Sequence, residues 1–406
     1  MEQKLTFTNS ILTLNQAIKI KTKLSDVMAR YSGVGPSFDI IRLGLAIVIL
    51  FGHTRNLIFS GAESPSAAAQ LNFDIGNNLN ALVPDSIFSY IMQIESRIYV
   101  LYVPMFFVLS GFLVAGSALR LKNIRVFLIH RGLRIFPALT FEVFLSAIIL
   151  GMFFSKLPVR DYVRDPQFLR YFGNIFGFVT FTLPGVFEEN PLPNIVNVNL
   201  WTLPAEFYCY LTFSIAMAIG LPYYVGRTLI FIVVTYVALS IAAVLWGFGV
   251  APSVYSNLAI TYYFAVGVAF FVLKSYIPYH FTVFLFSAIA VALATPFPNL
   301  SFVIAPLLAY LTIYIGFLPK LALPFLKGND YSYGIYLYGF PISQGIVSIF
   351  PKMSRMELFF LALSMTLAVA ICSWHWIEKP CLKLKKRLTN SKSATVMEIK
   401  TAQDKN

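Results

Sequence analysis

Two polar side chains interrupt the apolar stretch FDIIRLGLAIVILFGHT (38–54): Arg42 near its start and His53 near its end. An imidazole titrates near neutrality, so His53 can take a proton from a hydroxyl or carry an acyl group transiently. The guanidinium of Arg42 can hold an anionic group. The alternative is that Arg42 extends to lipid headgroups beside Asp39 and that His53 is a hydrogen-bonded structural histidine.

Helical geometry places Arg42 and His53 on nearly the same face. Eleven residues at about 100° each amount to about three turns plus 20°. The rise of about 1.5 Å per residue separates the two side chains by about 16 Å along the axis. The two residues therefore lie along one face of the helix, with an anion-binding group at one end and a base at the other.

A second basic pair lies in HRGLRIFP (130–137), where Arg131 and Arg134 are one helical turn apart. Two guanidinium groups at this spacing can hold a phosphate or a diphosphate through several hydrogen bonds. Anchoring of a membrane helix at its cytosolic end explains an isolated pair of this kind equally simply.

A carboxylate, Glu206, lies just inside the apolar run of NLWTLPAEFYCY (199–210). A buried carboxylate usually pairs with a cation or holds a proton. Glu206 can therefore orient His53 or pair with Arg42 or Arg55, and only the packing decides between these roles. Glu142 is a weaker candidate of the same kind.

The composition shows what kind of elements must position these residues. Of the 406 residues, 58% are hydrophobic and only 12% are charged, and the mean hydropathy is +0.72. This balance indicates an integral membrane protein. The three cysteines are scattered without metal-ligand spacing, so we expect neither a metal site nor a disulfide framework. The net charge of +13 lies in tails and alternate loops, which argues against nucleic acid as a partner.

Segments long enough to cross the bilayer predict an all-α, polytopic membrane helical bundle of about ten transmembrane helices. We expect a basic N-terminal tail over 1–37, a transmembrane domain over 38–377 and a basic C-terminal tail over 378–406. The candidate spans are 38–59, 98–118, 135–154, 203–221, 228–248, 257–273, 281–297, 301–318, 332–350 and 358–377.

The distribution of basic residues predicts that both termini are cytoplasmic. With this orientation the inside segments hold 22 of the 31 Lys and Arg residues and the outside segments hold seven. The polar, basic N-terminal tail does not read as a cleaved signal peptide. Two outside loops, 60–97 and 155–199, are long enough to form lids or partly re-entrant covers.

The ordered motifs resemble those of acyltransferase family three, a family of integral membrane O-acyltransferases. Arg42 and His53 match its R-x10-H pattern, and Arg131 with Arg134 match its RxxR pattern. The stretch LWTLPAEF (200–207) is similar to its W-[S/T]-L-x-x-E motif, which places Glu206 on the motif's acid. The remaining matches are FFVLSGFL (106–113), SYGIYLYGFP (332–341) and WIEKP (376–380).

The resemblance implies an enzyme that moves an acyl group, expected to be acetyl, from cytosolic acyl-CoA to a carbohydrate hydroxyl. His53 and Glu206 would be catalytic, and Arg42, Arg131 and Arg134 would bind the donor. Acetyl-CoA would be a substrate, with no permanently bound cofactor. The acceptors implied are extracytoplasmic or lipid-linked exopolysaccharide or lipopolysaccharide, with polysaccharide-assembly proteins as further partners, in the lipid bilayer of the bacterial cytoplasmic (inner) membrane.

One position departs from the family pattern, because Gly339 stands where the family often has His. Tyr336 and Tyr338 are the neighbouring side chains that could handle a proton there. A transporter or flippase for a lipid-linked or anionic solute is the alternative function, since buried Arg, His and Glu also suit a translocation path. A structural subunit would explain the spans but not the ordered motifs.

Overall fold

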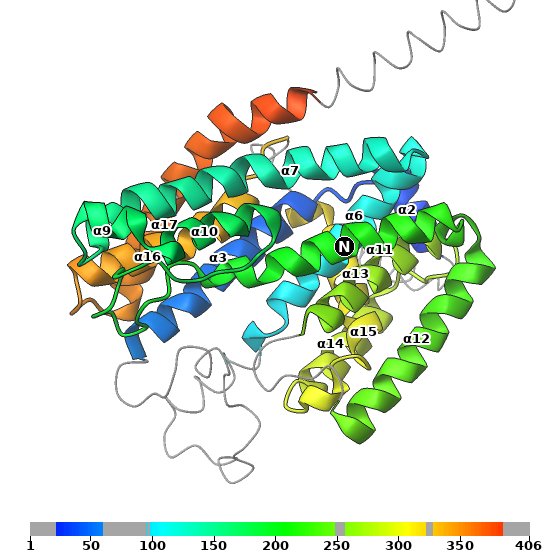
Figure 1. The fold of residues 1–406 in the computed structure, drawn as a ribbon. Helices are drawn as coiled ribbons and strands as arrows, with labels where there is room; N and C mark the ends of the chain where they lie inside the picture. Colours follow the sequence, from blue (N-terminus) through cyan, green and yellow to red (C-terminus); the bar gives the residue numbers. More distant parts are fainter. Residues whose placement is uncertain (1–21, 60–94, 96–97, 248–255, 322–327, 385–406) are drawn as a thin grey trace, which may run out of the picture. The chain divides into compact units, whose positions relative to one another are not determined.

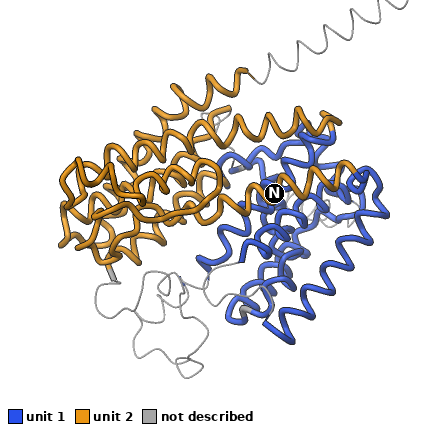
Figure 2. The backbone as a smooth tube through the Cα atoms, viewed as in Figure 1, with its two compact units in different colours: residues 1–41, 75–119, 219–324 blue, residues 42–74, 120–218, 325–406 orange. Residues whose placement is uncertain are grey.

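The computed structural model describes residues 22–59, 95, 98–247, 256–321 and 328–384. The chain divides into two compact units (Figure 2). Unit 1 comprises residues 1–41, 75–119 and 219–324, and unit 2 comprises residues 42–74, 120–218 and 325–406. Within the described residues the fold is all-helical, with only isolated β-bridges and no strand, as the sequence predicts.

Helix α3 (Phe38–Phe59) belongs to both units, because the division falls between residues 41 and 42. The last two residues of α6 (Tyr102–Leu121) also fall in unit 2, because another division lies between residues 119 and 120. The other helical elements of unit 1 are α2 (Leu24–Arg30), α6 (Tyr102–Leu121), η5 (Leu221–Tyr223), α12 (Val225–Trp246), α13 (Asn257–Val272), α14 (Phe281–Ala294), η6 (Pro298–Leu300), α15 (Ala305–Gly316) and η7 (Pro319–Leu321). Those of unit 2 are α7 (Ile124–Phe144), η2 (Leu145–Leu150), α8 (Gly151–Phe154), α9 (Val159–Arg164), α10 (Pro166–Tyr171), η3 (Phe172–Phe176), η4 (Val198–Thr202), α11 (Leu203–Ala218), α16 (Ser332–Ile349), α17 (Arg355–Ser373) and η9 (Trp374–Glu378).

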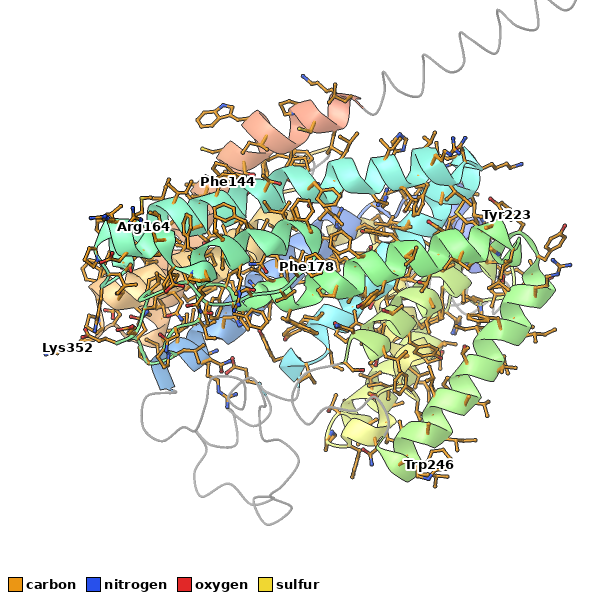
Figure 3. All side chains as sticks on the ribbon, viewed as in Figure 1. Phe144, Arg164, Phe178, Tyr223, Trp246 and Lys352 are labelled. Carbon is orange, nitrogen blue, oxygen red and sulfur yellow. The ribbon has the colours of Figure 1, made fainter. Side chains whose placement is uncertain are left out.

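Each of the ten predicted spans contains a helix. Among the described residues, five helices are long and apolar enough to cross a membrane, and α13, α14 and α15 are shorter apolar helices. Helix α12 has the exposed apolar surface that lipid contact requires, and Trp246 at its end is 75% exposed (Figure 3). The bundle of membrane helices is thus supported, while the number of ten spans and the side of the termini stay predictions.

The third predicted span, 135–154, begins too late. The helix starts at Ile124, where the Asn123 side chain accepts a hydrogen bond from the backbone N–H of Val126 at 3.1 Å. It continues through η2 and α8 to Phe154 (Figure 1). The first turns of this helix contain polar residues of the kind found in loops, but several of these residues contact buried partners in unit 2. Arg131 and Arg134 therefore lie within the helix rather than at its entry.

Close helix packing in unit 1 depends on two glycines. A Cβ atom on Gly111 of α6 would lie 2.1 Å from the carbonyl oxygen of Phe264 on α13. A Cβ atom on Gly267 of α13 would lie 2.1 Å from the carbonyl oxygen of Val108 on α6. The glycine in the FFVLSGFL motif thus permits backbone contact between α6 and α13, as small residues do between membrane helices.

Part of each predicted tail is helical. Helix α2 lies within the predicted N-terminal tail and buries Leu24, Val27 and Met28. Its first N–H groups donate to the carbonyls of Ile277 and Lys274 in the same unit. At the other end, the helix that begins at Arg355 continues to Leu384. The loop predicted at 60–97 lies, except for Glu95, outside the described residues.

Part of the predicted outside loop at 155–199 lies along α16 and is hydrogen-bonded to it. Asn190 donates to both the carbonyl and the side-chain oxygen of Gln344, at 2.9 and 2.7 Å. Asn197 donates to the carbonyl of Leu337 at 2.9 Å, and Asn199 donates to that of Tyr336 at 2.6 Å. Eight residues of α16 correspond to about 12 Å, so the segment lies alongside about two turns of this helix.

Candidate active site

The His53 imidazole is buried within unit 2, with 8% of the residue exposed. Its ring meets the ring of Phe340 on α16 edge-on, with 5.2 Å between the centroids. The side chain of Asn199, in η4, is its polar neighbour. Burial between an aromatic ring and a single amide restricts the imidazole to few orientations, which is what a base with a defined target requires.

The α3 backbone beside His53 is fixed by Arg355, at the start of α17. Arg355 Nη2 donates to the carbonyl oxygen of Phe51 at 3.1 Å, and its guanidinium lies 4.0 Å from the centroid of the Phe51 ring. The hydroxyl of Thr54 also donates to the Phe51 carbonyl, at 2.7 Å. These contacts secure the helical turn that carries His53.

Asn199 is held by hydrogen bonds from both its side chain and its backbone, which restrict the orientation of its side chain. Its amide nitrogen donates to Tyr336, and its backbone N–H donates to Asn197 Oδ1 at 3.1 Å. Among the described residues no well-formed hydrogen bond reaches the buried Asn199 Oδ1. An imidazole N–H is a suitable donor for this oxygen. Sequence reasoning missed Asn199, although it directly precedes the LWTLPAEF motif.

Glu142 supports the same segment from α7. Its Oε1 atom accepts hydrogen bonds from Ser146 Oγ and from Asn197 Nδ2, both at 2.8 Å. The Glu142 side chain is fully buried. Glu142 therefore supports Asn197, which in turn positions Asn199, so this carboxylate acts on the site through two intervening residues.

The arginines predicted to bind an anion gather around Asp330, the residue that precedes α16 by two positions. Arg42 Nη2 lies 2.5 Å from Asp330 Oδ2, and Arg134 donates to the same oxygen. Arg134 Nη1 also lies 3.5 Å from Glu378 Oε2 in η9. One ionic cluster thus joins α3 and α7 to Asp330, just before α16, and joins α7 to Glu378 in η9.

Asp330 stays ionised in this cluster. Burial alone would raise the pKa of its carboxyl, but the charges of Arg134 and Arg42 and hydrogen bonds from Ser332 lower the pKa to about 2. Asp330 Oδ1 accepts from both the backbone N–H and the hydroxyl of Ser332. One carboxylate oxygen is therefore anchored on α16 and the other bridges two guanidinium groups.

The C-terminal WIEKP region completes the surroundings of Arg134. The Arg134 guanidinium lies 5.4 Å from the ring centroid of Tyr333 and 5.8 Å from that of Trp374. Asn329 accepts hydrogen bonds from Trp374 Nε1 at 3.1 Å and from Lys379 Nζ at 3.3 Å. Aromatic faces and carboxylates thus hold Arg134 in one position.

Arg131 and Glu206 lie in the same cluster. The Arg131 guanidinium lies 5.8 Å from the ring centroid of Phe127 and 6.0 Å from that of Tyr210. Glu206 interacts electrostatically with Arg134, Arg131 and Arg42. Within the described part of the chain, neither Arg131 nor Glu206 takes part in an ion pair shorter than 4 Å.

The structure therefore divides the predicted site residues into two groups. Arg42, Arg131 and Arg134 come together, and Glu206 joins them, whereas His53 is next to Phe340 and Asn199. Arg42 and His53 both face α16, as their eleven-residue spacing predicts. Sequence reasoning did not identify Asp330 or Glu378. The only signal for Asp330 is a carboxylate directly before the SYGIYLYGFP motif.

The position that departs from the family pattern faces α3. A Cβ atom on Gly339 would lie 2.9 Å from Leu50 Cδ1, one helical turn before His53. The hydroxyl of Tyr338 is hydrogen-bonded to Ser373 at 2.7 Å, and that of Tyr336 to Thr202 at 3.0 Å. The two tyrosines proposed for proton handling therefore have structural hydrogen-bond partners.

Comparison with known proteins identifies the family of this chain. The family model described as an acyltransferase domain matches residues 36–375. An O-acetyl transferase of Shigella phage Sf6 is 25% identical over 291 residues, covering 68% of this chain and 82% of the phage protein. Nodulation protein 10 of Rhizobium leguminosarum bv. viciae is 26% identical over 390 residues, covering 88% and 96%. No solved structure matches the chain.

Proposed function

Because this chain belongs to the acyltransferase domain family, and is an O-acyltransferase, we propose that it takes acetyl groups from cytosolic acetyl-CoA. The acceptor in this proposal is a hydroxyl of an extracytoplasmic or lipid-linked polysaccharide in the bacterial inner membrane. Acetyl is favoured over other acyl groups because the phage relative is named an O-acetyl transferase.

One observation carries the proposal of a coenzyme A donor: arginines from two helices, α3 and α7, converge on one cluster in unit 2. Arg42 and Arg134 share a single oxygen of Asp330, and Arg134 also reaches Glu378, which leaves N–H groups on both guanidinium groups for other acceptors. Phosphate oxygens are suitable acceptors for such groups. Coenzyme A carries three phosphoryl groups, and the cluster holds three arginines.

The separation of the two groups of residues suits this donor. Arg42 and His53 lie about 16 Å apart along α3. Coenzyme A carries its thioester at the end of the long pantetheine arm. Phosphates held at the arginines would therefore allow the acyl group to reach the buried imidazole, while the segment at 155–199 approaches the same place along α16.

Two routes are open for the chemistry at His53. As a base, His53 takes the proton of the acceptor hydroxyl while the oxygen attacks the thioester carbonyl. The carbon–sulfur bond then breaks, and the departing thiolate of coenzyme A takes up the proton. As a nucleophile, the imidazole first attacks the thioester carbonyl, and the carbon–sulfur bond breaks to release the thiolate of coenzyme A. The acceptor hydroxyl then attacks the acyl-imidazole, the imidazole leaves, and the proton of the hydroxyl is taken up by the thiolate.

Transfer can be tested directly with inverted membrane vesicles and acetyl-CoA labelled in the acetyl group. The proposal expects label bound covalently to polysaccharide, and that labelling should require the protein. A transporter or flippase would accumulate solute without covalent label. Vesicles that leave polysaccharide unlabelled, although they contain folded protein and acceptor, would contradict the proposal.

Donor binding is tested separately on the purified protein. Arg131→Ala and Arg134→Ala should each weaken coenzyme A binding by roughly ten-fold or more, because each removes hydrogen bonds to charged groups. Arg164→Ala, in the exposed last turn of α9, is the matched control and should bind as the parent does. Unchanged binding in both cluster variants would refute a phosphate site at these arginines.

A further inference from the structure

Two buried atoms near the arginine cluster have unmet hydrogen-bonding capacity. They are Arg131 Nε and Glu206 Oε2, and neither has a hydrogen-bond partner among the described residues. A buried donor or acceptor without a partner costs free energy, so each such atom in a folded protein requires an explanation. Here one atom is a donor and the other is an acceptor, and α7 packs against α11, which carries Glu206.

Direct ion pairing does not explain Glu206. Asp330 already pairs with Arg42 and Arg134, and Glu378 pairs with Arg134. Glu206 interacts electrostatically with the three arginines but contacts none of them within 4 Å in the described part of unit 2. The carboxylate thus lies near three guanidinium groups without forming a direct ion pair with any of them.

The rings around Arg131 restrict how it can meet a ligand. Phe127 and Tyr210 lie close to its guanidinium, so the side chain cannot turn freely toward Glu206. A ligand that satisfies both residues must carry an anionic oxygen for Arg131 and, a short distance away, an O–H or N–H group for Glu206. In coenzyme A this combination occurs where the diphosphate joins the pantetheine arm, which bears a hydroxyl and two amide N–H groups.

We propose that Arg131 and Glu206 form a subsite for the junction between the diphosphate and the pantetheine arm of the acyl donor. Arg131 binds a phosphate oxygen, and Glu206 accepts a hydrogen bond from the hydroxyl or an amide of the arm. The inference rests on the proposed function and deepens it. It makes Glu206 a residue that binds and directs the arm, and not a group that acts on the reacting carbonyl.

This role predicts opposite effects for two ligands. A phosphate ligand without the arm gains nothing from Glu206 and is repelled by its charge. A ligand with the arm gains a hydrogen bond to a charged acceptor, which is among the stronger kinds. Removing the charge of Glu206 should therefore weaken the binding of a ligand that has the arm. Binding of a phosphate ligand without the arm should stay unchanged or become tighter.

The test compares coenzyme A with 3′-phosphoadenosine 5′-diphosphate, which is coenzyme A without its pantetheine arm. Binding of both ligands is measured by calorimetry on the full-length protein in detergent, for the parent, Glu206→Gln and Arg131→Ala. Glu206→Gln should weaken coenzyme A about ten-fold, and should bind the armless ligand at least as tightly as the parent. Arg131→Ala should weaken both. Glu189→Gln, an exposed carboxylate that pairs with Lys156, is the matched control.

Equal weakening of both ligands by Glu206→Gln, or no weakening of either, would overturn the subsite. Unchanged binding with lost acetyl transfer would assign Glu206 to the chemistry instead and would also overturn it. If Glu206→Gln does not fold, Glu206→Asp, which retracts the carboxylate by one methylene, should weaken coenzyme A selectively. A parent protein that binds neither ligand would refute the proposed function itself, whereas binding that is weakened by Arg131→Ala but not by Glu206→Gln would refute only the subsite.

Discussion

At the residue scale, the chemistry depends first on His53. Both proposed routes use its imidazole, which lies beside Asn199 and Phe340. His53→Ala should lower the rate of acetyl transfer by about 10²–10⁴-fold, the range that general acid–base catalysis contributes. Coenzyme A binding should persist, since the arginine cluster lies elsewhere along α3.

The control for this substitution is His375→Ala, an exposed histidine in η9. It should transfer acetyl groups at the parental rate, measured by label incorporated into polysaccharide. Parental transfer by a folded His53→Ala protein would remove His53 from the chemistry.

Asn199 allows a second test at the same scale. Because its side chain is the polar neighbour of the His53 imidazole, Asn199→Ala should lower kcat by roughly ten-fold or more and leave KM for acetyl-CoA unchanged. Steady-state kinetics with acetyl-CoA as the varied substrate separate the two constants.

Asn190→Ala is the matched control, because Asn190 is a buried asparagine in the same segment at 155–199 but contacts Gln344. It should lower stability and leave kcat largely intact. If both asparagine variants lose kcat equally, the effect of Asn199 is one of folding and not of positioning the imidazole.

At the scale of elements, Asp330 joins α3, α7 and α16. The pKa of its carboxyl is about 2 in the folded protein, below its ordinary value of 3.8. A lowered pKa stabilises the folded state fully above about pH 5, and this stabilisation is lost as the pH falls toward 2. Between pH 5 and pH 3 the parent should lose about 1 kcal/mol from this group, while Asp330→Asn should not.

Unfolding by denaturant in detergent at the two pH values measures this difference. Asp161→Asn, an exposed carboxylate of α9, should respond to pH as the parent does. Equal losses of stability in the parent and in Asp330→Asn would show that the bridge between the arginines contributes nothing to the fold.

At the scale of the whole molecule, the distribution of charge predicts the orientation in the membrane. A cysteine at Lys352, between α16 and α17 (Figure 3), should react with an impermeant maleimide in intact cells. A cysteine at Arg125, near the start of α7, should react only after the membrane is opened. The three native cysteines, Cys209, Cys372 and Cys381, are first replaced by serine. The reverse pattern would place both termini outside.

The amino-acid sequence by itself determined the class of the protein, its family and the approximate place of each apolar helix. These properties follow from local composition and from motifs whose order can be read along the chain. It also placed Arg42 and His53 on one face, because helical periodicity is a local property. It misplaced the start of α7, because residues that face a buried ionic cluster are as polar as those of a loop.

Only the tertiary structure decided which residues meet. Asp330 contacts Arg134 across 196 positions of the chain, and Asn199 contacts the backbone of Tyr336 across 137. No local pattern encodes such pairs, because they depend on how α3, α7 and α16 pack within unit 2. The same packing decided between the roles that the sequence left open for Glu206: it lies near Arg42 and the other arginines, where its unpaired oxygen is available to a ligand.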